Sequence, residues 1–440
     1  MPSNNHPRRR PQPPASLALP GRLAAVLLAV AASAAHAGDA SLIEQGRYLA
    51  TAGDCVSCHT RPNGEPFAGG VALSTPFGTI FSANITPDRV SGIGAWSESQ
   101  FVRAMRDGVA PDGSHLYPAF PYTAYTRLSD ADVGAIFAYL RSLQPVRYTP
   151  PANQMHFPFG SRHLLAAWKL LYFTPARYVT DSKRSAEWNR GAYLTLGLGH
   201  CGACHTPRTV LGAERESEAL SGGEYLDEIA DEVIDGKLTP LDEPIVRPWA
   251  APNLTPATSG LGAWSLDGIV DYLKAGHSAR AAGFGPMAGV IENSTRHLSD
   301  QDLRAIAVYL KSLPATPAGS FARAAADRLR AGEAVYNSRC GDCHLQSGLG
   351  VPRGGDGSKA APPLAGSAVV QAPNPASLIN VVLYGAHELN ASAGGWPRMS
   401  GFELSVGLDD EHIAAVCTYV RASWGNHAGP VDAAAVAAQR

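Results

Sequence analysis

Apolar residues recur at helical spacing in three blocks of the chain, each with a tyrosine near its end. The first two blocks begin with Ser-Asp-x-Asp, which supplies an N-cap hydroxyl and acidic side chains in the first turn. We predict a helix for each block and name these the closing helices, because each ends a repeated unit. They cover residues 130–143, 300–313 and 409–424.

A helix is also predicted at the start of each unit, the first over residues 41–52. These opening helices share one glycine and one tyrosine: Gly46 and Tyr48, Gly191 and Tyr193, Gly332 and Tyr336. Glycine destabilises a helix interior unless another backbone must come close. We therefore expect each glycine to mark a contact with a second helix, the closing helix of its unit.

The first two units resemble each other more than the third. The first contains Asn84-Ile-Thr-Pro87 and then Gly92-Ile-Gly-Ala-Trp96, and the second contains Asn253-Leu-Thr-Pro256 and then Gly260-Leu-Gly-Ala-Trp264. A chain of 440 residues is long enough for about three domains. We predict an all-α fold of three tandem helical domains at residues 38–145, 187–315 and 322–426, followed by a tail at 427–440.

Two stretches depart from the repeat. The linker at 146–186 contains the apolar run 162–173, which is too short to span a bilayer. Packing between domains is the favoured interpretation of this run, and a surface patch for a partner or a membrane interface is the alternative. The second stretch, 212–247, is an acidic insertion that we expect to form a solvated loop.

The N-terminus has the pattern of a secretory signal peptide, residues 1–37. Four arginines precede the apolar run 23–32, and Ala35-His-Ala37 provides a cleavage site. Removing four arginines and no acidic residue changes the formal charge from −2 to −6. We therefore expect a periplasmic protein that does not bind nucleic acid.

The motif C-x-x-C-H occurs three times, at 55–59, 201–205 and 340–344. In this motif the two thiols form thioethers with a haem and the histidine binds the iron. The sequence thus predicts three covalent haem c groups, one in each domain. The thioether residues are Cys55, Cys58, Cys201, Cys204, Cys340 and Cys343, and the proximal ligands are His59, His205 and His344.

Other roles for these cysteines fit less well. Zinc sites pair their C-x-x-C units or add H-x-x-x-H, whereas here each pair is followed at once by a histidine and the pairs lie far apart. A thioredoxin-like dithiol requires a βαβ pattern, which does not surround these motifs. The seventh cysteine, Cys417, lies in an apolar helical run and is predicted to be a buried core residue.

Methionine is the common sixth ligand of such haems. Met287 and Met399 lie just ahead of the second and third closing helices, so we predict that they bind iron. The first unit has Phe120 at the corresponding place, and His115 is the best remaining candidate. The alternatives are an open site, a ligand from the linker (Met155 or His156) or Met105, which we interpret as a core residue.

The chain resembles the three-haem cytochrome c subunits of membrane-bound bacterial dehydrogenases for alcohol, gluconate, fructose and sorbitol. The resemblance runs from about residue 46 to 426. It is carried by Asn84-Ile-Thr-Pro-Asp88, Leu116-Tyr-Pro118, Trp188-Asn-Arg-Gly191, His200-Cys-Gly-Ala-Cys-His-Thr-Pro-Arg208 and Trp424-Gly-Asn426.

This resemblance implies a periplasmic electron-transfer subunit with no catalysis of its own. Its partner would be a dehydrogenase catalytic subunit of the flavin, quinone-cofactor (PQQ) or molybdenum type. Its acceptor would be ubiquinone or a terminal oxidase at the periplasmic face of the cytoplasmic membrane. Many family members have methionine where this chain has Phe120. The competing hypothesis is a haem enzyme, similar to a peroxidase, or a sensor, with an open iron in the first domain.

Overall fold

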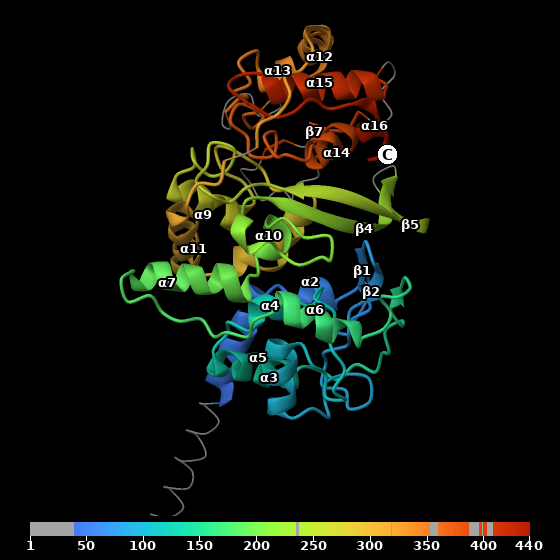
Figure 1. The fold of residues 1–440 in the computed structure, drawn as a ribbon, viewed down its shortest axis with the longest axis vertical. Coiled ribbons are helices and arrows are strands. Elements are labelled where there is room, and N and C mark those ends of the chain that lie inside the picture. The colour runs from blue at the N-terminus through green and yellow to red at the C-terminus, as the bar shows by residue number, and fades with distance from the viewer. Residues whose placement is uncertain are drawn as a thin grey trace, which may run out of the picture.

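The computed structural model describes residues 39–234, 237–317, 319–352, 360–386, 396–397, 399–402 and 408–440. The predicted signal peptide lies outside these residues and stays a prediction. No helix in the described ranges is long and apolar enough to cross a membrane. Figure 1 shows the first unit at one end of the molecule, the second in the middle and the third at the other end.

The first unit starts with a helix over residues 39–52 and ends with α5. The linker then adds one strand to the sheet of this unit and contributes one exposed helix, α6. The elements are α2 (Cys55–His59), β1 (Ala72–Thr75), β2 (Gly78–Phe81), α3 (Glu98–Asp107), α4 (Tyr122–Tyr125), α5 (Asp130–Ser142), β3 (Gln154–Met155) and α6 (Leu164–Tyr172).

The second unit repeats this order around a long hairpin. Its elements are α7 (Ala186–Tyr193), the π-helix η1 (Leu194–Leu198), α8 (Gly202–His205), η2 (Glu216–Glu218), β4 (Gly223–Ile234), β5 (Lys237–Ala251), α9 (Leu266–Ala275), α10 (Pro286–Asn293), η3 (Thr295–His297) and α11 (Asp300–Ser312). The third unit consists of α12 (Ala326–Arg339), α13 (Gly341–His344), α14 (Ala376–Tyr384), β6 (Gly385–Ala386), β7 (Met399–Ser400), α15 (Asp410–Ala422) and α16 (Ala433–Ala437).

The predicted contact between opening and closing helices is confirmed in all three units. A Cβ added to the opening-helix glycine would overlap a backbone carbonyl oxygen of the closing helix. The pairs are Gly46 with Ala135, Gly191 with Ala305 and Gly332 with Ala415. In each unit the next nearest group is the Cβ of a tyrosine four residues further along the closing helix. The absence of a side chain on the glycine therefore lets the two backbones touch.

A tyrosine from each of the first two units contacts the start of the other unit's closing helix. Tyr48 of the first unit donates to Asp302 of the second at 2.7 Å, and its hydroxyl accepts from the Ser299 amide at 3.1 Å. Tyr193 of the second unit makes the same two contacts in return, with Asp132 and with the Ser129 amide. The two units thus contact each other as a pseudo-symmetric pair.

The hydrophobic core follows the same division. One cluster of buried side chains runs through the first and second units, and it includes Leu49, Ile136, Leu198 and Leu303. A separate cluster fills the third unit, and it includes Tyr336, Leu383 and the predicted core residue Cys417. The first two units therefore share one core, whereas the third has its own.

One fold prediction was wrong. The acidic insertion is no solvated loop, because most of it lies in the antiparallel hairpin of β4 and β5. The all-α prediction is confirmed in part: the chain is mostly helical, with the sheet β1-β2-β3, this hairpin and the short pair β6-β7 added. Figure 1 shows the hairpin between the third unit above it and β1 and β2 below it. The tail also packs, since α16 lies against α15 and buries Val436.

Substituting Gly191→Ala tests the helix crossing. The new methyl group would overlap the Ala305 carbonyl, so the two helices must separate. We expect the free energy of unfolding to fall by about 1–3 kcal/mol, measured by chemical denaturation of the haem-loaded protein. Gly289→Ala is the control, because this α10 glycine has nothing within 4 Å of a Cβ and its replacement should be neutral or stabilising. Equal stability of both variants would contradict the close approach.

Candidate haem-attachment sites

Each C-x-x-C-H motif forms a short helical turn directly after its opening helix. The three turns are α2, α8 and α13, with Cys201 and Cys340 as the N-cap residues of the last two. Residues three apart in a helical turn lie on the same face, so the two thiols of each motif point the same way. All seven cysteines lie within the described residues and are unpaired. Burial raises the pKa of the thiols to about 12 in the first motif and about 11 in the second.

The motif histidines are held in one orientation by a repeated hydrogen bond. Nδ1 of His59 lies 2.7 Å from the Ala83 carbonyl oxygen, and Nδ1 of His205 lies 2.7 Å from that of Pro252. In the third unit the corresponding distance, from His344 to Pro362, is 3.0 Å. A carbonyl can only accept, so Nδ1 carries the proton and the lone pair on Nε2 is left for a metal. Burial lowers the pKa of all three histidines, which favours the neutral ring.

The repeated Asn-x-Thr-Pro motif positions the acceptor carbonyl in the first two units. The asparagine directly follows the acceptor residue, and its Oδ1 accepts from the amide and hydroxyl of the threonine two residues later. Its Nδ2 donates to the segment after the closing helix, to Val146 from Asn84 and to Thr316 from Asn253. The sequence shows this motif without its role, because the acceptor residues themselves, Ala83 and Pro252, are not alike.

Met287, the predicted sixth ligand of the second unit, is half-buried as the second residue of α10. Gly285, two residues earlier, lies against the indole of Trp249, where an added Cβ would come within 2.8 Å of the ring. Trp249 is three residues before Pro252, the acceptor for His205. The start of α10, which carries Met287, and the histidine of the second motif therefore both contact the end of β5, and Met287 stays a predicted ligand.

Met399, the predicted ligand of the third unit, is half-buried in the two-residue strand β7. This strand pairs with β6, so that Met399 lies opposite Ala386. Its neighbour Arg398 lies outside the described residues.

The first unit has an aromatic group where the other units have methionine. The ring of Phe120 packs on Tyr125 with 5.5 Å between centroids. Tyr125 is buried, and its pKa is raised well above the usual value, first by burial and then by the nearby thiols of Cys55 and Cys58. Tyr125 thus connects Phe120 to the first haem-attachment site.

His115, the predicted sixth ligand of the first unit, contacts the linker helix. Its Nδ1 lies 3.1 Å from Nζ of Lys169, whose pKa burial lowers to about 8, so that the ammonium form prevails at neutral pH. An ammonium group can only donate, so Nδ1 accepts and the ring proton is on Nε2. This geometry leaves no lone pair on Nε2 for iron and favours a packing role for His115.

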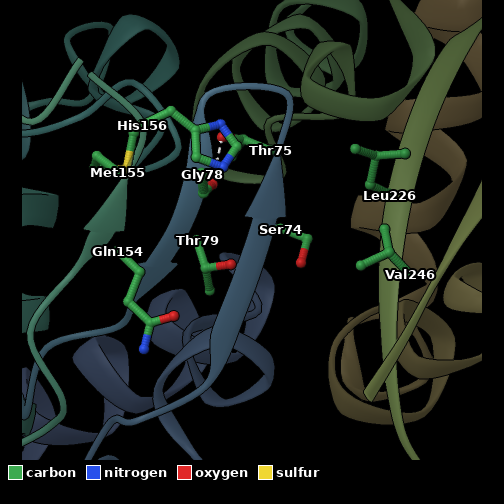
Figure 2. Close-up of a pocket in the computed structure, with 9 residues that line it drawn as sticks. All are labelled: Ser74, Thr75, Gly78, Thr79, Gln154, Met155, His156, Leu226 and Val246. Carbon is green, nitrogen blue, oxygen red and sulfur yellow. Dashed lines mark hydrogen bonds between the residues drawn. The ribbon is translucent and has the colours of Figure 1, made fainter. Parts of the chain in front are cut away.

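The other candidates of the first unit have different surroundings. Met105 is buried in the shared core, as predicted. Met155 and His156 line a pocket of about 500 Å³ between the sheet β1-β2-β3 and the hairpin, opposite Leu226 and Val246 (Figure 2). None of the residues that line this pocket belongs to a C-x-x-C-H motif.

The first and second motifs lie next to each other. Gly53, two residues before Cys55, packs on the side chain of Leu198, and its carbonyl accepts from Nε2 of His200 at 3.3 Å. The thiol of Cys58 is close enough to Cys204 for that thiol to contribute to its raised pKa. The two haem-attachment sites therefore share one interface.

Known proteins match the chain over most of its length. The family described as "Cytochrome c" matches residues 43–144, and that described as "Cytochrome C oxidase, cbb3-type, subunit III" matches residues 327–420. The cytochrome c subunit of alcohol dehydrogenase (quinone) from Gluconobacter oxydans is 40% identical, over 92% of this chain and 84% of that protein.

Two further relatives differ more in length from this chain. A nicotinate dehydrogenase subunit from Pseudomonas putida is 42% identical over 87% of this chain, but the match spans only 30% of that protein. A diheme cytochrome c-type protein from Cereibacter sphaeroides is 39% identical over 63% of this chain and 87% of its own length. With haem-attachment motifs in cytochrome c domains and relatives alike over nearly their whole length, the chain belongs to the family of cytochrome c subunits of bacterial dehydrogenases.

Proposed function

We propose that the chain is a periplasmic three-haem cytochrome c that carries electrons from the catalytic subunit of a dehydrogenase to ubiquinone or another respiratory acceptor. The partner is a dehydrogenase, as the names of the relatives suggest, and the family resemblance implies one of the flavin, quinone-cofactor or molybdenum type. Haem c supplies a one-electron couple at iron. The family favours this role over the peroxidase-like or sensor hypothesis.

The observation that carries the proposal is the shared interface of the first two motifs. Gly53, Leu198 and His200 bring the segments just before the two attachment turns into direct contact. An electron carrier needs such closely spaced centres, whereas an enzyme needs a cleft for its substrate.

The third unit joins this pair through the hairpin. Oγ of Ser377 on α14 accepts from the Ala250 amide at 2.9 Å and donates to the Ala250 carbonyl at 2.9 Å. Asn380 on the same helix donates to the Pro248 carbonyl at 2.8 Å. Because β5 also leads to Pro252, the acceptor for His205, one strand connects the second attachment site to the third unit. We infer a linear order of the three centres along the chain.

We expect electron transfer to depend on a separate catalytic subunit. The test is purification of the native complex from membranes, followed by addition of its substrate while haem absorption is monitored. Reduction should occur with the dehydrogenase subunit present and stop when that subunit is removed. Substrate oxidation by the isolated cytochrome would contradict the proposal.

Replacing Met287 or Met399 by leucine tests the proposed sixth ligands. Leucine keeps the volume of methionine and removes the sulfur. We expect one haem in each variant to change from low to high spin and its potential to fall, since methionine ligation raises the potential. Met105→Leu is the matched control, because this methionine is a core residue whose replacement should leave all spin states unchanged. Unchanged spectra for Met287→Leu or Met399→Leu would reject that ligand.

His115→Ala separates the two interpretations of the first unit. If the contact with Lys169 sets the role of His115, the spin state of the first haem stays unchanged in the variant. Loss of a low-spin signal would instead establish His115 as the sixth ligand. Electron paramagnetic resonance of the oxidised protein distinguishes the two results.

The carboxyl of Asp54 should make the potential of the first haem depend on pH. Burial raises its pKa to about 7, although Ser57 donates to it at 2.6 Å. A carboxylate formed above that pH favours ferric iron, so the potential should fall as pH rises through about 7, by at most about 59 mV per pH unit. Redox titrations of Asp54→Asn over roughly pH 5 to 9, on both sides of that pKa, should give a haem potential that does not change with pH. An unchanged slope in the variant would contradict this assignment.

A further inference from the structure

The linker helix α6 is oriented opposite to an ordinary surface helix. Three of its four leucines face solvent, with Leu164, Leu170 and Leu171 exposed to 46%, 89% and 70%, whereas Leu165 and the single charged residue, Lys169, are buried. A surface helix usually buries its apolar stripe and exposes its charges. The observed orientation therefore raises two questions: what holds the lysine inside, and what the exposed leucines contact.

The cause is the set of contacts that Lys169 makes inside the first unit. Its Nζ donates to the carbonyl oxygen of Gly108 at 2.8 Å and to Nδ1 of His115 at 3.1 Å. The same ammonium lies over the ring of Tyr122, 4.6 Å from the centroid. These contacts stabilise the helix with Lys169 and Leu165 inward, and the other three leucines are turned outward as a result.

The exposed apolar area extends beyond the helix. Nε1 of Trp168 donates to the Leu211 carbonyl at 2.9 Å, which fixes α6 beside the loop after the second haem motif. In that loop Val210 is 90% exposed and Leu211 is also exposed. We define the α6 surface as Leu164, Leu170, Leu171, Val210 and Leu211. Trp168 and Tyr172 of the same helix pack against each other in a tilted arrangement, with 5.5 Å between their ring centroids.

The charge of the linker that carries α6 differs from that of the whole chain. Residues 146–186 contain six basic residues and one acidic residue, an excess of five positive charges, although the formal charge of the chain is −2. Lys183 and Arg184 are exposed after the helix, where Arg184 lies 4.0 Å from Asp181, and the half-exposed Arg177 lies 3.6 Å from Asp130. Arg162 and Lys169 donate to backbone carbonyls, which leaves their positive charges uncompensated by those contacts.

We propose that the α6 surface rests on the anionic phospholipid surface of the membrane. Leucine, tryptophan and tyrosine on one face of a short helix, flanked by basic residues, are the features of a segment that lies in the interface without crossing it. The excess positive charge fits anionic headgroups. This inference takes only the periplasmic location from the proposed function. Lipid binding itself is measured independently of electron transfer.

The experiment is sedimentation of the haem-loaded full chain with vesicles, of phosphatidylcholine alone and of phosphatidylcholine with phosphatidylglycerol. We expect binding to the anionic vesicles that weakens as salt rises. Leu170→Gln/Leu171→Gln should reduce this binding at least about tenfold, since two exposed leucines lose their burial. Lys183→Glu/Arg184→Glu should reduce binding to anionic vesicles and remove its salt dependence.

Val90→Gln is the matched control, because Val90 is 70% exposed in the loop between β2 and α3 and is not part of the α6 surface, so that its vesicle binding should equal that of the unmodified chain. Haem absorption and thermal unfolding establish that each variant is folded. If the leucine variant binds vesicles as well as the control does, the proposal is overturned. Loss of co-purification with the dehydrogenase subunit at unchanged vesicle binding would also overturn it, by showing that the α6 surface contacts a protein. Failure of electron transfer alone affects the proposed function and leaves the vesicle result standing.

Discussion

The contact on which the rest of the structure depends is the crossing of two helices at a glycine. In each unit the opening helix passes so close to the closing helix that only a hydrogen atom fits opposite the carbonyl oxygen of an alanine. The C-x-x-C-H turn follows the opening helix directly, so the crossing also fixes where the thiols and the histidine lie. Packed backbones change position little, and this rigidity holds each attachment turn in place relative to the closing helix of its own unit.

The pairing of the first two units follows from the same helices. Tyr48 and Tyr193 lie two residues after the glycines of their opening helices, and each reaches the start of the other unit's closing helix. Each hydroxyl thus contacts a helix N-terminus that its own unit does not supply. Because these contacts run in both directions, each unit supplies hydrogen bonds at the start of the other's closing helix. The same packing of the two units gives them a single shared core. The part of the third unit that the structure describes makes no such contact.

The sequence predicted the features that depend on local chemistry. Helix starts at Ser129 and Ser299, the glycine crossings and the haem motifs depend on residues that are close together or strictly repeated. The hairpin was missed because β4 and β5 pair with each other across an acidic stretch without clear alternation. It is held by contacts with distant segments, such as Ser74 to Glu228 and Ser377 to Ala250. The acceptor carbonyls of Ala83 and Pro252 were missed because a backbone atom has no sequence signal of its own.

The departures from the repeat explain how three similar units form one carrier. A strict repeat would give each unit the same neighbours, and nothing would distinguish the order of the centres. The hairpin breaks this equivalence, since among the described residues it belongs to the second unit alone and contacts both others: Glu228 accepts from Ser74 of the first unit, and Glu224 accepts from Asn374 of the third. The middle unit thus becomes the one through which the ends connect. The linker makes the units unequal in a second way. Lys169 hydrogen-bonds α6 to the first unit, and Trp168 hydrogen-bonds it to the loop of the second. The repeated elements therefore hold the attachment sites, and the unrepeated elements determine how those sites are arranged and which face of the molecule meets its surroundings.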